Sequence, residues 1–146
     1  MIADKALDEL KAWIEHRGGE YAEVANWTIT KAGKATNKDF PQVVLEATSA
    51  EEHETLRGVM DPLTVEVRLE SIPHEDGSAA GAYTLADHEA AATDLYCILA
   101  DSAAVQFIDA RGVVRCFDIR GAEGTLETED DLRVSTIEVR MVCSTF

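Results

Sequence analysis

The sequence predicts an α+β fold, in which a single antiparallel or mixed β-sheet of about four strands packs on one or two helices and carries a projecting C-terminal β-hairpin arm. Three patterns support this prediction. Val65, Val67 and Leu69 alternate with charged residues, as in a strand with one buried and one solvated face. Residues 85–99 instead repeat apolar side chains at helical intervals. Two apolar segments near the C-terminus flank an acidic stretch, which indicates a hairpin.

The first expected element is a helix over residues 3–17, ended by Gly18 and Gly19. Its apolar face is formed by Ala6, Leu7, Leu10 and Ile14, with Trp13 at the border. Residues 20–40 are expected to form a long, locally basic loop, in which residues 27–31 have the composition of a short strand.

The next segment, residues 43–45, is too apolar for a strand with one wet face, so we expect a central strand that ends near Thr48. Ser49 and Glu52 have the spacing of a capping box, which predicts a short helix over residues 50–56. The alternating strand around Val67 follows, and its pattern implies a sheet that is covered on one side.

A second capping box, Thr84 with Asp87, predicts the start of the main helix, which should run to about Asp101 and cover the sheet. The expected apolar stripe of this helix is Leu85, His88, Ala92, Leu95, Tyr96 and Leu99. Residues 113–120 then read as a third long strand, with Phe117 and Ile119 pointing inward.

The last strand contains a slip in its apolar phase. Leu132 and Val134 are apolar at even positions, whereas Ile137 and Val139 are apolar at odd ones. A flat strand cannot bury both sets on one face, so we expect a bulge near Ser135 and Thr136. Alternatively, the arm beyond the slip leaves its own sheet and buries apolar side chains against another subunit: Leu126, Leu132 and Val134.

The composition suits one domain spanning residues 1–146. With 28 acidic and 13 basic residues, the formal net charge is −15, which argues against binding nucleic acid by phosphate neutralisation. No apolar run approaches a membrane span and no signal-peptide pattern opens the chain, so synthesis in the cytoplasm is expected. Cys97, Cys116 and Cys143 lack disulfide or zinc spacing, and we expect reduced core residues.

The sequence shows no positive sign of enzymatic chemistry. His88-Glu89 begins a zinc-protease pattern but the second histidine is missing, so we expect His88 to be a helix-surface or core-edge residue. A metal site remains a weaker alternative, built from His74, Glu75 and Asp76 together with His53 or His88. Nucleophile-elbow, phosphate-loop and dinucleotide motifs are absent from the sequence. We therefore expect no catalytic residue, no metal and no cofactor.

The densest acidic stretch lies between the last two strands. It comprises Glu123, Glu127, Glu129, Asp130 and Asp131, and has no glycine-turned calcium pattern. Such a stretch is most simply a solvated loop whose charges repel one another. The functional interpretation is an exposed arm whose charge faces a partner or a channel. A hairpin with two apolar strands and a charged tip is also suited to adding to a neighbouring sheet.

The order of elements resembles the tail terminator (tail completion) proteins of long-tailed bacteriophages. The resemblance covers residues 41–143. It is carried by the segment 47–53, by the alternation at residues 65–69, by the helix at 86–100, by Phe117-Asp118-Ile119-Arg120 and by the acidic hairpin that leads into residues 133–139. Members of that family are small α/β virion proteins that form a hexameric ring on the head-proximal end of the tail tube, end tube polymerisation and prepare head–tail joining.

The resemblance implies a homohexameric ring in the virion that contacts the tail tube protein and a head–tail connector protein, with no membrane partner. Residues implied in subunit or tube contact are Leu126, Glu127, Thr128, Leu132 and Val134. Acidic residues implied at the lumen are Glu123, Glu129, Asp130 and Asp131, where like charge would let DNA pass without binding. The competing interpretations are another head–tail connector or minor tail protein, and a small metal-dependent hydrolase built on His53, His74 and Asp76.

Overall fold

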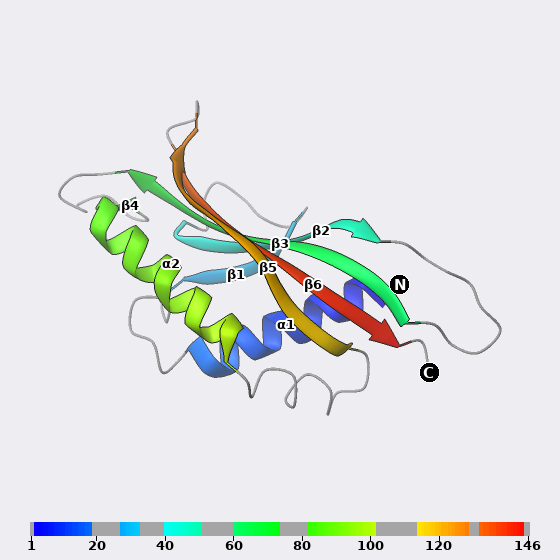
Figure 1. Ribbon diagram of the computed structural model, residues 1–146. Helices are drawn as coiled ribbons and strands as arrows, with labels where there is room; N and C mark the ends of the chain where they lie inside the picture. Colours follow the sequence, from blue (N-terminus) through cyan, green and yellow to red (C-terminus); the bar gives the residue numbers. More distant parts are fainter. Residues whose placement is uncertain are drawn as a thin grey trace.

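The computed structural model describes residues 2–18, 27–32, 40–50, 60–73, 82–101, 114–128 and 132–144. Their elements are, in chain order, α1 (Ile2–Gly18), β1 (Thr28–Lys31), β2 (Gln42–Ala50), β3 (Met60–Pro73), β4 (Ala82–Tyr83), α2 (Leu85–Ala100), β5 (Val114–Glu127) and β6 (Arg133–Ser144). The strands form a sheet in the order β1-β2-β3-β6-β5, and the short β4 pairs with β3. The predicted α+β class is confirmed, although the sheet is wider than the four strands expected (Figure 1).

Both helices lie on one face of the sheet, as Figure 1 shows. The core forms between them because β3 and β6 turn their odd-numbered side chains toward the helices. Val65, Val67 and Leu69 are fully buried, whereas the even-numbered positions between them are partly exposed. The predicted sheet covered on one side is therefore confirmed, and the opposite face stays open among the described residues.

Strand β2 is central, as its apolar run predicts. Val43, Val44 and Leu45 have no more than 1% of their surface exposed, because β1 and β3 flank the strand. Strand β1 pairs in parallel with β2, with Thr28 opposite Gln42. The prediction of one long loop over residues 20–40 is thus wrong for residues 28–31, where the short-strand alternative holds.

The two helices are tied to each other by side chains near their C-terminal ends. The indole Nε1 of Trp13 donates to the Ile98 carbonyl oxygen over 3.0 Å in the core, and Arg17 Nε lies 2.8 Å from an Asp101 carboxylate oxygen. At the start of α2, the Thr84 hydroxyl accepts from the Asp87 amide over 3.2 Å, which confirms the predicted cap.

The apolar stripe of α2 is only partly as predicted. The buried side chains are His88, Ala91, Leu95, Ile98 and Leu99. Leu85 and Tyr96 are exposed instead, at 48% and 44%, because the face that meets the sheet is rotated toward Ala91 and Ile98. The spacing located the helix correctly, but an apolar side chain at its edge is not necessarily buried.

The capping box at Ser49 does not start a helix. Ser49 and Ala50 belong to β2, where they pair with Thr64 and Leu63 of β3 across a register shift after Ala47. Pairing with β3 supplies the backbone hydrogen bonds that a helix start would otherwise need, so the strand continues past Thr48. The rest of the predicted helix over residues 50–56 lies outside the described residues.

The C-terminal hairpin exists, but its acidic part is mostly strand. β5 continues to Glu127, so Glu123 and Glu127 pair with β6, opposite Thr136 and Arg133. The Thr128 amide donates to the Leu132 carbonyl oxygen over 2.8 Å and closes the turn. In Figure 1 this end of the hairpin rises above the helices.

The predicted bulge near Ser135 and Thr136 is wrong. β6 pairs with β3 without a shift from Arg133 to Ser144, so it does not leave its own sheet. The register shifts lie on β5, including one between Glu123 and Leu126. The phase slip arose because two polar residues, Arg133 and Ser135, occupy inward positions and are 4% and 3% exposed.

Candidate functional site

The hairpin presents an apolar pair on the open face of the sheet. Leu126 of β5 pairs with Val134 of β6, and Val134 lies at an even position that faces away from the helices. The Leu126 side chain is 63% exposed, more than Leu85 or Tyr96, and Val134 is partly buried. The two adjacent apolar side chains at the edge of the sheet are a candidate contact for another protein.

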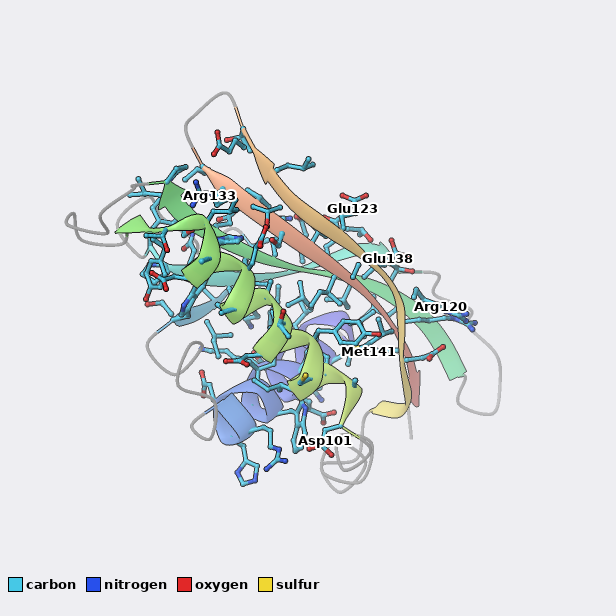
Figure 2. The ribbon with its side chains drawn as sticks, turned by 60° about the vertical axis from the view of Figure 1, so that its left-hand side comes forward. Asp101, Arg120, Glu123, Arg133, Glu138 and Met141 are labelled. Atoms are coloured by element: carbon cyan, nitrogen blue, oxygen red, sulfur yellow. The ribbon has the colours of Figure 1, made fainter. Side chains whose placement is uncertain are left out.

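On the other face of the hairpin, Arg133 connects the adjoining ends of β5 and β6 to β4. Its Nη1 donates to the Tyr83 carbonyl oxygen over 3.1 Å, and its Nη2 lies 3.2 Å from Glu127 Oε1. The guanidinium thus links β6 to β4 and to the end of β5, and Figure 2 shows Arg133 at the hairpin end of β6. Glu127, which the resemblance implies in partner contact, is held by this ion pair while its side chain remains 65% exposed.

Beside Arg133 lies a buried polar cluster around His88. Its Nδ1 is 2.6 Å from Ser71 Oγ and its Nε2 is 2.9 Å from Ser135 Oγ. Ser135 Oγ is also 3.0 Å from Thr125 Oγ1 of β5. Burial, and secondarily the nearby Arg133 charge, lower the pKa of His88 to about 4, so the imidazole is neutral at physiological pH.

This cluster is structural rather than catalytic. A serine nucleophile must reach a substrate, yet Ser71 and His88 have no exposed surface. The cluster instead joins β3, α2, β6 and β5 at the hairpin end of the sheet. The interpretation of His88 as a helix-surface or core-edge residue is wrong, and the phase slip in β6 was the sequence signal for its buried polar partners.

A groove lies between α2 and the hairpin, on the helix side of the sheet. Its volume is about 270 Å³ and its wall is mostly apolar. Ala122 is paired with Ile137 and faces α2, but its methyl group is too small to fill the space beside the helix. The other lining residues that define the groove are Ala92, Thr93, Tyr96 and Ser135, with the charged Glu123 at the same wall.

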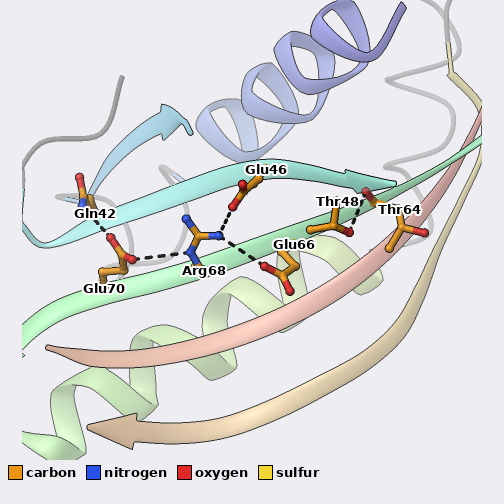
Figure 3. Close-up of polar contacts among 7 residues, drawn as sticks. All are labelled: Gln42, Glu46, Thr48, Thr64, Glu66, Arg68 and Glu70. Atoms are coloured by element: carbon orange, nitrogen blue, oxygen red, sulfur yellow. Dashed lines mark hydrogen bonds and ion pairs between the residues drawn. The ribbon is translucent and has the colours of Figure 1, made fainter. Parts of the chain in front are cut away.

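The open face of the sheet carries a charge network centred on Arg68. Figure 3 shows its guanidinium between the carboxylates of Glu46, Glu66 and Glu70. Glu66 lies 3.4 Å from Nη1, Glu70 lies 3.6 Å from Nε, and the pair with Glu46 is the tightest. These three carboxylates raise the pKa of Arg68, against the opposing effect of its burial. One cation among three anions leaves this part of the face negative.

The structure separates the residues implied in contact. Leu126 and Val134 share the open face, Thr128 is exposed at the turn, Leu132 is partly buried and Glu127 pairs with Arg133. Of the acidic residues implied at the lumen, Glu123 is exposed on β5. Glu129, Asp130 and Asp131 lie outside the described residues.

The proposed metal ligands are not brought together in the described part of the chain. His53, His74, Glu75 and Asp76 lie outside it, and the described ranges hold no cluster of three potential ligands. Cys97 is exposed on α2, so its predicted place in the core is wrong, while the side chains of Cys116 and Cys143 are not described. Within the same ranges, no helix is long and apolar enough to cross a membrane.

Comparison with known proteins identifies a shared fold. No family model and no curated protein matches the chain. A chain of a solved structure, described as the virion of a native gene transfer agent (GTA) particle, is similar with a TM-score of 0.52. The two chains are 18% identical, and the match covers 84% of this chain and 82% of the other. At that identity the similarity shows a shared fold over most of both chains.

Proposed function

We propose that this protein is a structural virion protein that forms a ring on the head-proximal end of a phage tail tube, ends tube polymerisation and prepares head–tail joining. The observation that carries the proposal is the fold shared, over most of both chains, with a chain of a gene transfer agent virion. The order of elements resembles that of tail terminators, and this resemblance supports the proposed position in the tail. The proposed role is structural, in assembly of the virion.

The hairpin supplies a surface suited to that role. Leu126 is exposed beside Val134 on an edge strand, and the inner face of the same hairpin is fixed by Arg133 and the His88 cluster. A rigid support lowers the entropy cost of docking, because the apolar pair is already held in position before binding. Subunit and tube contacts are placed at Leu126, Thr128 and Val134.

The negative charge of the open face is suited to the wall of a channel through which DNA passes. The Arg68 network leaves excess carboxylate on the open face, and Glu138 is exposed on the same face of β6. Glu123, which also lines the groove, is exposed on β5. Carboxylates at a lumen repel the phosphate backbone, so DNA slides past without a specific contact. The lumen is accordingly assigned to this acidic surface together with residues 129–131.

A tube-capping assay tests the function. Purified tail tube protein is polymerised with and without the full-length chain, and tube length and end occupancy are measured by electron microscopy. The wild type should shorten tubes and occupy one end, whereas Leu126→Glu should lose this effect. Leu85→Glu, which alters an exposed leucine on α2, is the matched control and should cap like the wild type.

The same assay separates the terminator from the runner-up, another head–tail connector or minor tail protein of the virion. A connector would form rings but would leave tube growth unchanged. Unchanged tube length in the presence of wild-type rings would therefore reject the terminator and favour the connector.

A further inference from the structure

We infer that the copies of this chain contact one another head to tail, with Leu126 of one copy inserted into the groove between α2 and the hairpin of the next. The inference deepens the proposed function and rests on it, because a ring needs a contact that repeats around its axis. It names the partner of the exposed leucine as a second copy and the receiving site as the groove lined by Ala122, Tyr96 and Ile137.

The first argument is the position of the two surfaces. Leu126 pairs with Val134 on the open face, whereas Ala122 pairs with Ile137 on the helix face of the same hairpin. The protruding side chain and the hollow therefore lie on opposite faces of one element. A symmetric two-fold contact uses the same patch twice, but a contact between two different patches repeats in one direction and gives rings when the rotation closes.

The second argument is charge. Copies of a chain with formal net charge −15 repel each other, so close contact costs least where few carboxylates face one another. The groove has one carboxylate, Glu123, among otherwise uncharged lining residues, and the protruding pair Leu126 and Val134 is uncharged. Both surfaces are thus mainly apolar, and their contact buries few charges.

The third argument is the kind of contact that β5 allows. An edge strand can add a neighbouring strand through its free backbone groups, but bulges interrupt such pairing. β5 has register shifts after Val114, after Ile119 and after Glu123, so its edge is a poor template for a continuous added strand. A side-chain contact through Leu126 suits this edge better, and the groove of about 270 Å³ has room for a leucine side chain.

Site-directed cross-linking tests the contact in the full-length protein. In a background with Cys97→Ser, Cys116→Ser and Cys143→Ser, which removes the three native thiols, one preparation carries Leu126→Cys and a second carries Ala122→Cys. Both positions are exposed, so neither substitution should affect folding. After mixing and mild oxidation, a disulfide-linked dimer should form in the mixture and remain at background in each preparation alone.

The outcomes are distinct. A dimer in the Leu126→Cys preparation alone would overturn the inference in favour of a symmetric contact, and rings that form without any cross-link in the mixture would overturn it while leaving the ring intact. Cross-linking in the mixture by a protein that fails to cap tubes would support the contact and reject the proposed function. As a second readout, Leu126→Glu and Ala122→Trp should each weaken self-association at least about tenfold, and Leu85→Glu should not.

Discussion

His88 Nε2 lies 2.9 Å from Ser135 Oγ, and this contact joins the first turns of α2 to the hairpin end of β6. The imidazole also meets Ser71 and lies edge-on to Trp27, with ring centroids 5.8 Å apart. A neutral histidine serves here because it donates from one ring nitrogen and accepts at the other, whereas an imidazolium can only donate. The support of the hairpin therefore depends on the protonation state of His88.

Acid should destabilise the protein through His88. Its pKa is lowered from 6.5 to about 4, so between these values the unfolded chain binds a proton that the folded chain does not. Stability then falls as the pH drops through this window, by about 3 kcal/mol in total. Urea unfolding at a series of pH values should show this slope, and His88→Gln, which has no titrating ring, should flatten it. An NMR titration that placed the His88 pKa near 6.5 would contradict the prediction.

Replacing Arg133 should weaken the hairpin and change the titration of His88. Arg133→Met removes the donor to the Tyr83 carbonyl oxygen and should lower the free energy of unfolding by about 1–3 kcal/mol. Because the Arg133 charge lowers the pKa of His88, the same substitution should raise that pKa. The control is Glu127→Gln, whose exposed ion pair should contribute less than about 1 kcal/mol. An unchanged His88 titration in Arg133→Met would count against this electrostatic coupling.

Removal of the Arg68 cation should expose the repulsion among the three carboxylates that surround it. Arg68→Ala leaves the carboxylates of Glu46, Glu66 and Glu70 without their shared partner, and should lower the free energy of unfolding by about 1–3 kcal/mol. About 1 M salt should recover part of the loss, because it screens the remaining charges. Arg140→Ala, at an exposed position of β6, should stay within about 0.5 kcal/mol of the wild type. Equal losses of stability in Arg68→Ala and Arg140→Ala would contradict the stabilising role of Arg68.

Two tryptophans allow a matched test of the contact between the helices. Trp13 and Trp27 are both buried, but Trp13 Nε1 donates to the Ile98 carbonyl oxygen, whereas Trp27 Nε1 has no hydrogen-bond partner in the structure described. The change to phenylalanine removes similar volume at each site. Trp13→Phe should therefore cost about 1–2 kcal/mol more than Trp27→Phe in chemical unfolding. A larger loss at Trp27 would show that packing, not this hydrogen bond, decides the difference.

The sequence was sufficient for the elements whose pattern follows from burial. Val65, Val67 and Leu69 identified a strand with one wet face, the run at Val43 identified a central strand, and Thr84 identified a helix start. Each of these signals depends on the burial of apolar side chains or on the capping of a helix, and the fold preserves both. The capping box at Ser49 failed because pairing with β3 outweighed a weak local preference.

Only part of the candidate site could be predicted from the sequence. The resemblance implied contact roles for Leu126 and Val134, but the burial of Arg133 and Ser135 was not predicted because polar residues usually face water. Ser135 is buried against His88, whereas Arg133 is held by the Tyr83 carbonyl oxygen and Glu127. His88 and Tyr83 lie far away in sequence, so no local pattern reveals these hydrogen bonds. The groove could not be predicted from the sequence either, because it depends on the distance between α2 and a small residue, Ala122.

Electron microscopy of the purified full-length protein, alone and mixed with tail tube subunits, tests the ring most directly. The account predicts class averages with six-fold symmetry and a central channel, and the same rings at one end of short tubes. A protein that remains monomeric at all concentrations and leaves the tubes growing without a cap would contradict it.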